Sequence, residues 1–123
     1  MDKILNILAV GLGGALGSML RYGVTLLFAS MSWTGNAATM VVNVLGSFLI
    51  GYLSGSLEQG TLLLLLTVGF CGGFTTFSTF SSQSFRLFQD GRFGAMALYI
   101  ALSVILCVVF AGLGWTIAGH TSK

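Results

Sequence analysis

Four long apolar segments account for almost the whole chain. They cover roughly 4–28, 37–57, 61–88 and 94–118, and each is long enough to cross about 30 Å of hydrocarbon at about 1.5 Å per residue. The connections between them are short, so no residues remain for a soluble domain or a nucleic-acid-binding surface. Only 7% of the residues are charged and 55% are hydrophobic, a balance far from that of a soluble domain. The sequence therefore predicts a single all-α domain, 1–123, of four transmembrane helices in a lipid bilayer.

The positive charges are almost evenly divided between the two ends of this predicted bundle. Lys3 and Lys123 lie at the end that holds both termini, whereas Arg86 and Arg92 lie at the opposite end, where Arg21 can be added. The difference in Lys and Arg between the two sides of a membrane sets the orientation in which a chain inserts. A near tie predicts insertion in both orientations, and this would allow an antiparallel homodimer.

A double glycine lies near the middle of the third segment. Gly72 and Gly73 weaken a helix at this position, so we expect a break near 72–76. A broken helix at membrane depth persists only where protein or a water-filled cavity covers its freed backbone groups. Transporters place their ion sites at such breaks. The third segment therefore indicates a pathway for a small solute.

Other glycines recur in pairs at four-residue spacing, which lets helix backbones approach closely in lipid. For these pairs we expect ordinary helix packing within the bundle. They are Gly13 and Gly17, Gly51 and Gly55, and Gly69 and Gly73.

Polar side chains at four-residue spacing place one polar face on each of two segments. The two sets are Thr39, Asn43 and Ser47 in the second segment and Tyr99, Ser103 and Cys107 in the fourth. Together they could line one narrow path. For the hydroxyl groups the alternative is a bond back to a carbonyl of their own helix. The Asn43 amide is not satisfied so easily in hydrocarbon, so a functional or interhelical role is favoured for it.

Phe77 and Phe80 follow the predicted break and lie on nearly the same helix face. Such a stripe is usually core packing. Here, however, hydroxyl residues alternate with the rings through 75–84, and a dry core has no use for so many donors. Because ring edges carry a positive partial charge, rings and hydroxyls together would suit a small anion.

The charged residues exclude several classes of function. No acid lies deep within a segment, which argues against the runner-up interpretation, a small dual-topology multidrug or cation exporter. His120 is the one histidine, and no serine has a base beside it, so an enzyme is not supported. A purely structural four-helix protein would need neither a break nor a hydroxyl run. Arg21 either snorkels to the membrane interface, or is buried with partners and forms a positive vestibule that concentrates anions.

The run GFCGGFTTFSTFS at 69–81 resembles the signature of the Fluc/CrcB fluoride channels. GGALGSMLR at 13–21 and VNVLGS at 42–47 resemble the same family, and the length and four-span layout agree. The resemblance implies a fluoride-selective passive channel that exports cytoplasmic fluoride across the bacterial plasma (inner) membrane. It also implies a dual-topology homodimer with two pores and one structural Na⁺ on the dimer axis.

The resemblance further implies roles for individual residues. Phe77 and Phe80 look like the paired pore phenylalanines, and Asn43 looks like the pore asparagine that donates to fluoride. The expected pore set is Asn43, Phe77, Phe80, Ser78, Thr79, Thr39, Tyr99 and Ser103, with Arg21 in the vestibule. Backbone carbonyls of Gly72 and Thr75 from both subunits would hold the Na⁺. Cys107 and Gln83 depart from the family pattern, which concerns the outer part of the polar track.

Overall fold

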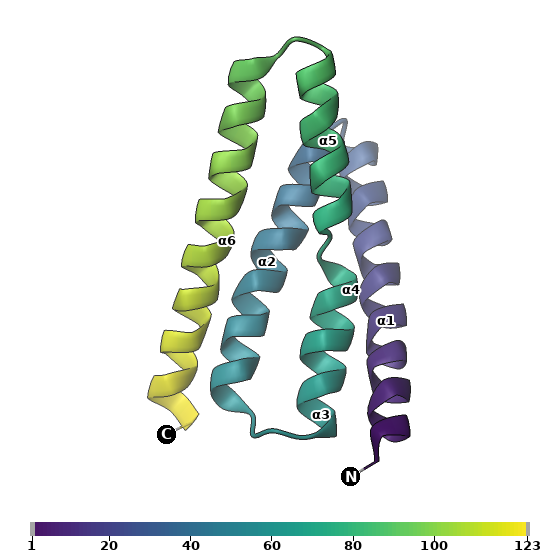
Figure 1. Ribbon diagram of the computed structural model, residues 1–123, viewed down its shortest axis with the longest axis vertical. Coiled ribbons are helices and arrows are strands. Elements are labelled where there is room, and N and C mark those ends of the chain that lie inside the picture. Colours follow the sequence, from purple (N-terminus) through teal and green to yellow (C-terminus); the bar gives the residue numbers. More distant parts are fainter. Residues whose placement is uncertain (1, 123) are drawn as a thin grey trace.

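The computed structural model describes residues 2–122 of the chain, with side chains through 119. The described residues form four long helical segments side by side (Figure 1). All four are long and apolar enough to cross a membrane, which confirms the prediction of an all-α, multi-pass membrane protein. The elements are α1 (Lys3–Ser30), α2 (Gly35–Ser56), α3 (Thr61–Leu64), η1 (Leu65–Cys71), α4 (Gly72–Phe74), α5 (Phe77–Gln89) and α6 (Phe93–Ser122). The side chain of His120 and the whole of Lys123 lie outside the described part.

Side-chain caps and one turn glycine set the helix boundaries. The Asp2 carboxylate accepts from the Ile4 N–H at 3.1 Å and begins α1, and the Thr34 hydroxyl accepts from the Ala37 N–H at 3.1 Å and begins α2. Between α5 and α6, Gly91 adopts a φ of 73°, which a residue with a side chain rarely adopts. These local signals explain why the observed helices begin and end close to the expected segments.

The third segment breaks at Thr75 and Thr76, just after the double glycine. Both threonines are extended, with φ/ψ of −90°/164° and −153°/118°. The break falls inside the expected range 72–76, but Gly72 and Gly73 themselves remain helical in α4, so the glycines do not interrupt the helix as expected. The reason is a close contact with α1: a Cβ atom on Gly73 would lie 2.5 Å from the carbonyl oxygen of Gly14. The glycines therefore allow backbone contact, and the two residues after Phe74 form the break.

The paired glycines form two seams inside the bundle. On α1, a Cβ atom at Gly13 or Gly17 would collide with backbone carbonyls of the third segment, those of Leu65 and Phe70. On α2, a Cβ atom at Gly51 would collide with the carbonyl of Ala111 in α6. The prediction that these glycines serve helix packing is confirmed.

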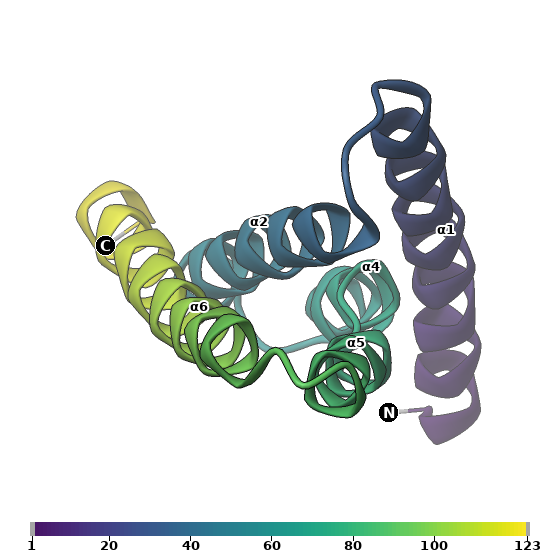
Figure 2. The same ribbon diagram turned by 90° about the horizontal axis from the view of Figure 1, so that it is seen from above.

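The third segment changes neighbours at its break. Before the break, η1 and α4 pack mainly against α1, and after it, α5 packs against α6, while α2 contacts the third segment on both sides of the break (Figure 2). Phe80 and Leu87 of α5 join Tyr99 of α6 in a buried cluster. The third segment, with its break, therefore lies between α1 on one side and the α2–α6 pair on the other.

Candidate functional site

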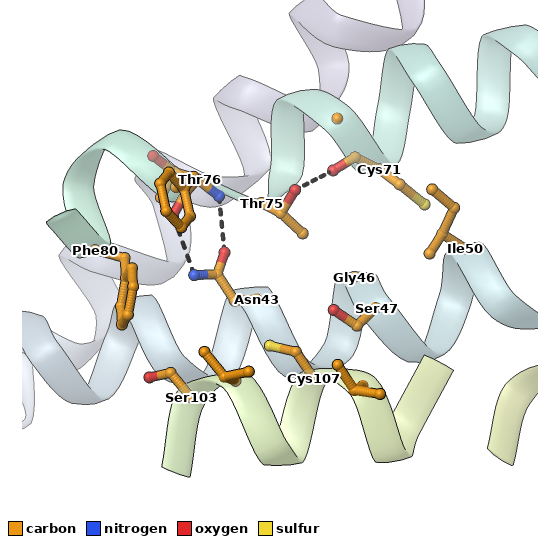
Figure 3. A pocket seen from close by; sticks show the side chains of 14 residues that line it. Asn43, Gly46, Ser47, Ile50, Cys71, Thr75, Thr76, Phe80, Ser103 and Cys107 are labelled. Atoms are coloured by element: carbon orange, nitrogen blue, oxygen red, sulfur yellow. Dashed lines mark hydrogen bonds between the residues drawn. The ribbon is translucent and has the colours of Figure 1, made fainter. Parts of the chain in front are cut away.

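A groove opens beside the break, between α2, the third segment and α6 (Figure 3). Its volume is about 410 Å³. Most of its surface is apolar, so its few polar groups are conspicuous. Of the residues singled out from the sequence, it is lined by Asn43, Ser47, Gly72, Thr75, Phe77, Phe80, Ser103 and Cys107. Thr39, Ser78, Thr79, Tyr99 and Arg21 lie outside the lining.

Asn43 binds the backbone at the C-terminal side of the break, at Thr76. Its Nδ2 donates to the Thr76 carbonyl at 3.1 Å, and its Oδ1 accepts from the Thr76 N–H at 2.7 Å (Figure 3). In a continuous helix the Thr76 N–H would donate to the Gly72 carbonyl. The Asn43 Oδ1 thus replaces the carbonyl that the Thr76 N–H would have as its partner in a helix, and Nδ2 adds a second donor to the Thr76 carbonyl, which already begins α5 as its N-cap. This is the interhelical role expected for Asn43, and one Nδ2 hydrogen remains for a ligand.

The Thr76 hydroxyl begins the helix that follows. It accepts from the Thr79 N–H at 3.2 Å and donates to the Thr79 hydroxyl at 3.1 Å, and the Ser78 hydroxyl lies 3.3 Å away. Ser78 and Thr79 are therefore organised around the N-cap of α5 rather than along the groove. Thr76 was not predicted as a site residue, although threonine is one of the common N-cap residues at a helix start.

The backbone carbonyls around the break have unequal surroundings. In a continuous helix, the Gly72 carbonyl would accept from the Thr76 N–H and the Thr75 carbonyl from the Thr79 N–H. Here both N–H groups donate to side chains instead. The Gly73 carbonyl accepts from Arg21 Nε at 3.0 Å. The Gly72 and Thr75 carbonyls are the two expected to hold a cation, and both lie at the end of a helix where oxygens are exposed.

Phe77, Phe80 and Tyr99 form a row of rings above the groove. Phe77 and Phe80 have centroids 5.5 Å apart, and Phe80 and Tyr99 have centroids 5.3 Å apart. Phe77 is 77% exposed, whereas Phe80 is only 8% exposed. The two rings singled out together thus differ sharply, because Phe77 stands at the open edge of the groove and Phe80 in the buried cluster.

Polar contacts continue beyond Phe80. The Tyr99 hydroxyl donates to Gln83 Oε1 at 2.8 Å, and the buried Thr39 interacts with the same tyrosine. The predicted faces of α2 and α6 therefore meet at Thr39 and Tyr99. Gln83 supplies the acceptor that fixes the Tyr99 hydroxyl, a pairing that spacing along single segments does not reveal.

Ser103 is the most unusual polar group in the groove. It is 5% exposed, and its hydroxyl has no hydrogen-bond partner among the described residues. A buried hydroxyl without a partner costs about 1–3 kcal/mol, so such groups are rare unless a ligand uses them. Cys107 lines the groove one turn further along α6, and Cys71 lines it from the third segment; both are free thiols.

Gly46 is a groove residue that sequence reasoning missed. A Cβ atom at this position would collide with the Thr75 methyl group. Glycine at 46 therefore lets the break approach α2 closely enough for Asn43, one turn earlier, to reach Thr76. The two residues act as one contact, which explains why they occur together in VNVLGS.

Arg21 lies on the α1 side of the third segment, opposite the groove. Its side chain is half-buried, and Nε is fixed on the Gly73 carbonyl. This contact favours the buried alternative over a side chain that snorkels to the interface. Whether its charge concentrates anions stays a prediction.

Known proteins resemble the chain over most of its length. Residues 8–115 match the model of the family described as CrcB-like protein, Camphor Resistance (CrcB). A protein of Ruminiclostridium cellulolyticum named fluoride-specific ion channel FluC is 40% identical, covering 96% of this chain and 95% of the relative. One of the same name from Chlorobium chlorochromatii is 46% identical, covering 85% of each chain. The fluoride-specific ion channel FluC 1 of Listeria monocytogenes is 40% identical, covering 90% of this chain and 95% of the relative.

Proposed function

Because the chain belongs to the CrcB family, we infer that it is a fluoride-specific ion channel, the function for which its curated relatives are named. It is a membrane channel and not an enzyme. The observation that carries this conclusion is the groove, where the Asn43 amide, the unpartnered Ser103 hydroxyl and the Phe77 and Phe80 rings line one narrow space. Donors without acceptors are what a strongly hydrated anion needs when it leaves water.

Fluoride suits this arrangement better than a larger halide does. It is the strongest hydrogen-bond acceptor among the halides, so close donors compensate most for its dehydration. The free Nδ2 hydrogen of Asn43 and the Ser103 hydroxyl supply such donors, and the positive ring edges of Phe77 and Phe80 extend the path. Thr39 and Tyr99 would continue the polar path beyond the rings, whereas Ser78 and Thr79 would contribute to it from the N-cap of α5.

The function is tested with purified protein in liposomes loaded with fluoride or with chloride. Ion-selective electrodes would record efflux after a potassium ionophore is added, so that K⁺ movement dissipates the membrane potential that anion efflux would otherwise build up. We expect fast fluoride efflux and chloride efflux close to that of empty liposomes. Fluoride efflux no faster than in empty liposomes would refute the channel, and equal rates for both ions would refute its specificity.

The working assembly is an antiparallel homodimer with two pores, in the bacterial plasma (inner) membrane. Two observations support this proposal. The Lys and Arg residues are almost balanced between the two ends. In addition, α5 exposes Ser78, Ser81 and Ser82 on its outer side, and such a cluster of hydroxyls is unusual on a helix face turned to lipid. A second copy placed against this side and the open groove would cover both.

Cysteine labelling tests the antiparallel arrangement. In a variant with Cys71 and Cys107 replaced by serine, a cysteine introduced at Ser32 should react with a membrane-impermeant reagent from both faces of the cell membrane. The expected result is labelling of about half of the chains from each face, since the two orientations would be equally populated. Labelling from one face alone would contradict dual topology.

One Na⁺ on the dimer axis completes the proposed assembly. The break supplies the ligands it prefers, since the Gly72 and Thr75 carbonyls each lose a helical N–H partner to a side chain. Backbone carbonyl oxygens are ligands that suit a hard cation such as Na⁺. When bound, the ion would supply fixed positive charge between the two pores.

We expect this Na⁺ to be structural. Replacing all sodium by a large organic cation, for long enough to empty the site, should reduce fluoride efflux to the level of empty liposomes. A sodium gradient imposed on loaded liposomes should not drive fluoride uphill, because a resident ion does no transport work. Undiminished efflux after complete sodium removal would contradict the site, and sodium-driven fluoride accumulation would contradict its structural role.

A further inference from the structure

We propose that Arg21 is a positioning residue that keeps the helix of the third segment broken. Its Nε takes the place of the Phe77 N–H as the donor to the Gly73 carbonyl. In a continuous helix the carbonyl of residue 73 accepts from the N–H of residue 77. Here it accepts from Arg21 Nε at 3.0 Å, across 52 residues of sequence. This inference rests on the proposed channel function and concerns a residue that does not line the groove.

The glycine seam on α1 explains how Arg21 reaches the break. Gly14 and Gly17 bring the α1 backbone against Gly73 and Phe74. Arg21 follows one turn after Gly17, on the same face of α1. Side chains of a helix lean towards its N-terminus, and here this direction leads back along the seam to the level of Gly73. The close glycine contact between α1 and the third segment is therefore what allows Arg21 to reach the Gly73 carbonyl.

The charge of Arg21 is balanced by the end of a helix rather than by an acid. The three acids of the chain, Asp2, Glu58 and Asp90, lie at the ends of segments, and no ion pair of Arg21 is found among the described residues. The stretch from Thr61 to Phe74 ends at the break, and a helix C-terminus favours a cation that bonds its last carbonyls. Arg21 is thus placed where its charge and its Nε donor stabilise the C-terminus of this helix.

Arg21 and Asn43 together hold the two sides of the break. Asn43 on α2 satisfies Thr76, and Arg21 on α1 satisfies Gly73. Without Arg21, the Gly73 carbonyl regains a partner most easily by taking back the Phe77 N–H. That step would extend α4 into α5 and displace the Phe77 ring, which stands at the open edge of the groove.

Substitution by glutamine separates this role from a role of the charge. The Nε2 of glutamine is separated from Cα by the same number of bonds as the Nε of arginine, so Arg21→Gln keeps the donor and removes the charge. Arg21→Lys keeps the charge but places a methylene where the donor stood. Arg21→Met keeps the apolar stem and removes both. Arg86→Gln, at an exposed arginine on the same end of the bundle, is the matched control for the change in charge count.

Fluoride efflux from liposomes would be measured at high ionic strength, where attraction by surface charge is screened. Positioning predicts that Arg21→Gln conducts within about threefold of wild type, while Arg21→Lys and Arg21→Met are slower by about tenfold or more. The control should conduct at the wild-type rate. Elution of each variant as a folded dimer keeps the comparison valid, and if Arg21→Met does not fold, the glutamine and lysine variants decide.

Hydrogen exchange of the peptide that contains Phe77 gives a second readout. Closure of the break in Arg21→Lys should slow exchange of the Phe77 amide, whereas general loosening would speed it. Fast efflux by the lysine variant with slow efflux by the glutamine variant would assign Arg21 to charge and overturn the proposal. Wild-type rates for all three variants would overturn it as well. Since wild-type efflux is measured alongside, failure of the channel function itself would be seen separately.

Discussion

Phe77→Ile is expected to slow fluoride efflux by at least about tenfold, the factor that corresponds to about 1.4 kcal/mol in a barrier, while the protein stays folded. Phe77 is 77% exposed in the described protomer, so its loss removes little packing within the chain. Isoleucine keeps the hydrophobicity but lacks the positive ring edge that attracts an anion. Efflux from liposomes, together with elution of the dimer, measures the effect.

Two companion variants sharpen this result. Phe80→Ile should slow efflux as severely, but it also removes a buried ring that touches Phe77 and Tyr99, so a loss of stability is expected with it. Phe85→Ile is the control, because Phe85 is an exposed ring of the same helix that stacks on Phe88 away from the groove. If Phe77→Ile conducts like the control, the stripe is packing and not part of the pore.

Asn43→Ala is expected to have the largest effect of any single change, on both stability and efflux. The variant loses the acceptor of the Thr76 N–H and the donor to the Thr76 carbonyl in a half-buried place. Leaving the Thr76 N–H without a partner costs about 1–3 kcal/mol, and the lost bond to the Thr76 carbonyl adds to this cost. We expect the free energy of unfolding to fall by about 2–4 kcal/mol and efflux to fall by about 100-fold.

Asn36→Ala provides the matched control for this variant. Asn36 lies two turns earlier on α2, near the start of the helix, and does not line the groove. Its loss should leave efflux and the unfolding transition in denaturant unchanged. Asn43→Asp adds a second comparison, since it keeps an acceptor for Thr76 but brings a negative charge to the groove, and we expect it to block fluoride. An alanine variant that conducts and unfolds like wild type would remove Asn43 from both roles.

The sequence predicts the four helices well because their apolar runs and caps act locally. It also places Asn43 correctly as an interhelical residue, since an amide in hydrocarbon must find a partner. It misplaces the cause of the break. Glycine propensity argues that Gly72 and Gly73 end the helix, but contact with Gly14 keeps them helical, and the break falls on Thr75 and Thr76.

The contacts that sequence reasoning could not find join segments far apart in the chain. Arg21 and Gly73 meet because α1 and the third segment pack backbone against backbone, which periodicity within one segment cannot reveal. The different exposure of Phe77 and Phe80 also depends on where α5 turns towards α6. Such features follow from tertiary packing, which overrides local preference.

The hydrogen bonds between Asn43 and Thr76 determine which substitutions at positions 43 and 76 can compensate for one another. Asn43 binds the main chain of Thr76 and not its side chain, so no codon change at position 76 can create a substitute partner for a lost amide. Second-site suppressors of Asn43→Ala are therefore expected to be absent from position 76. Position 76 can change to any residue other than proline that still caps α5, whereas position 43 must keep a side chain that binds the backbone N–H and carbonyl of residue 76.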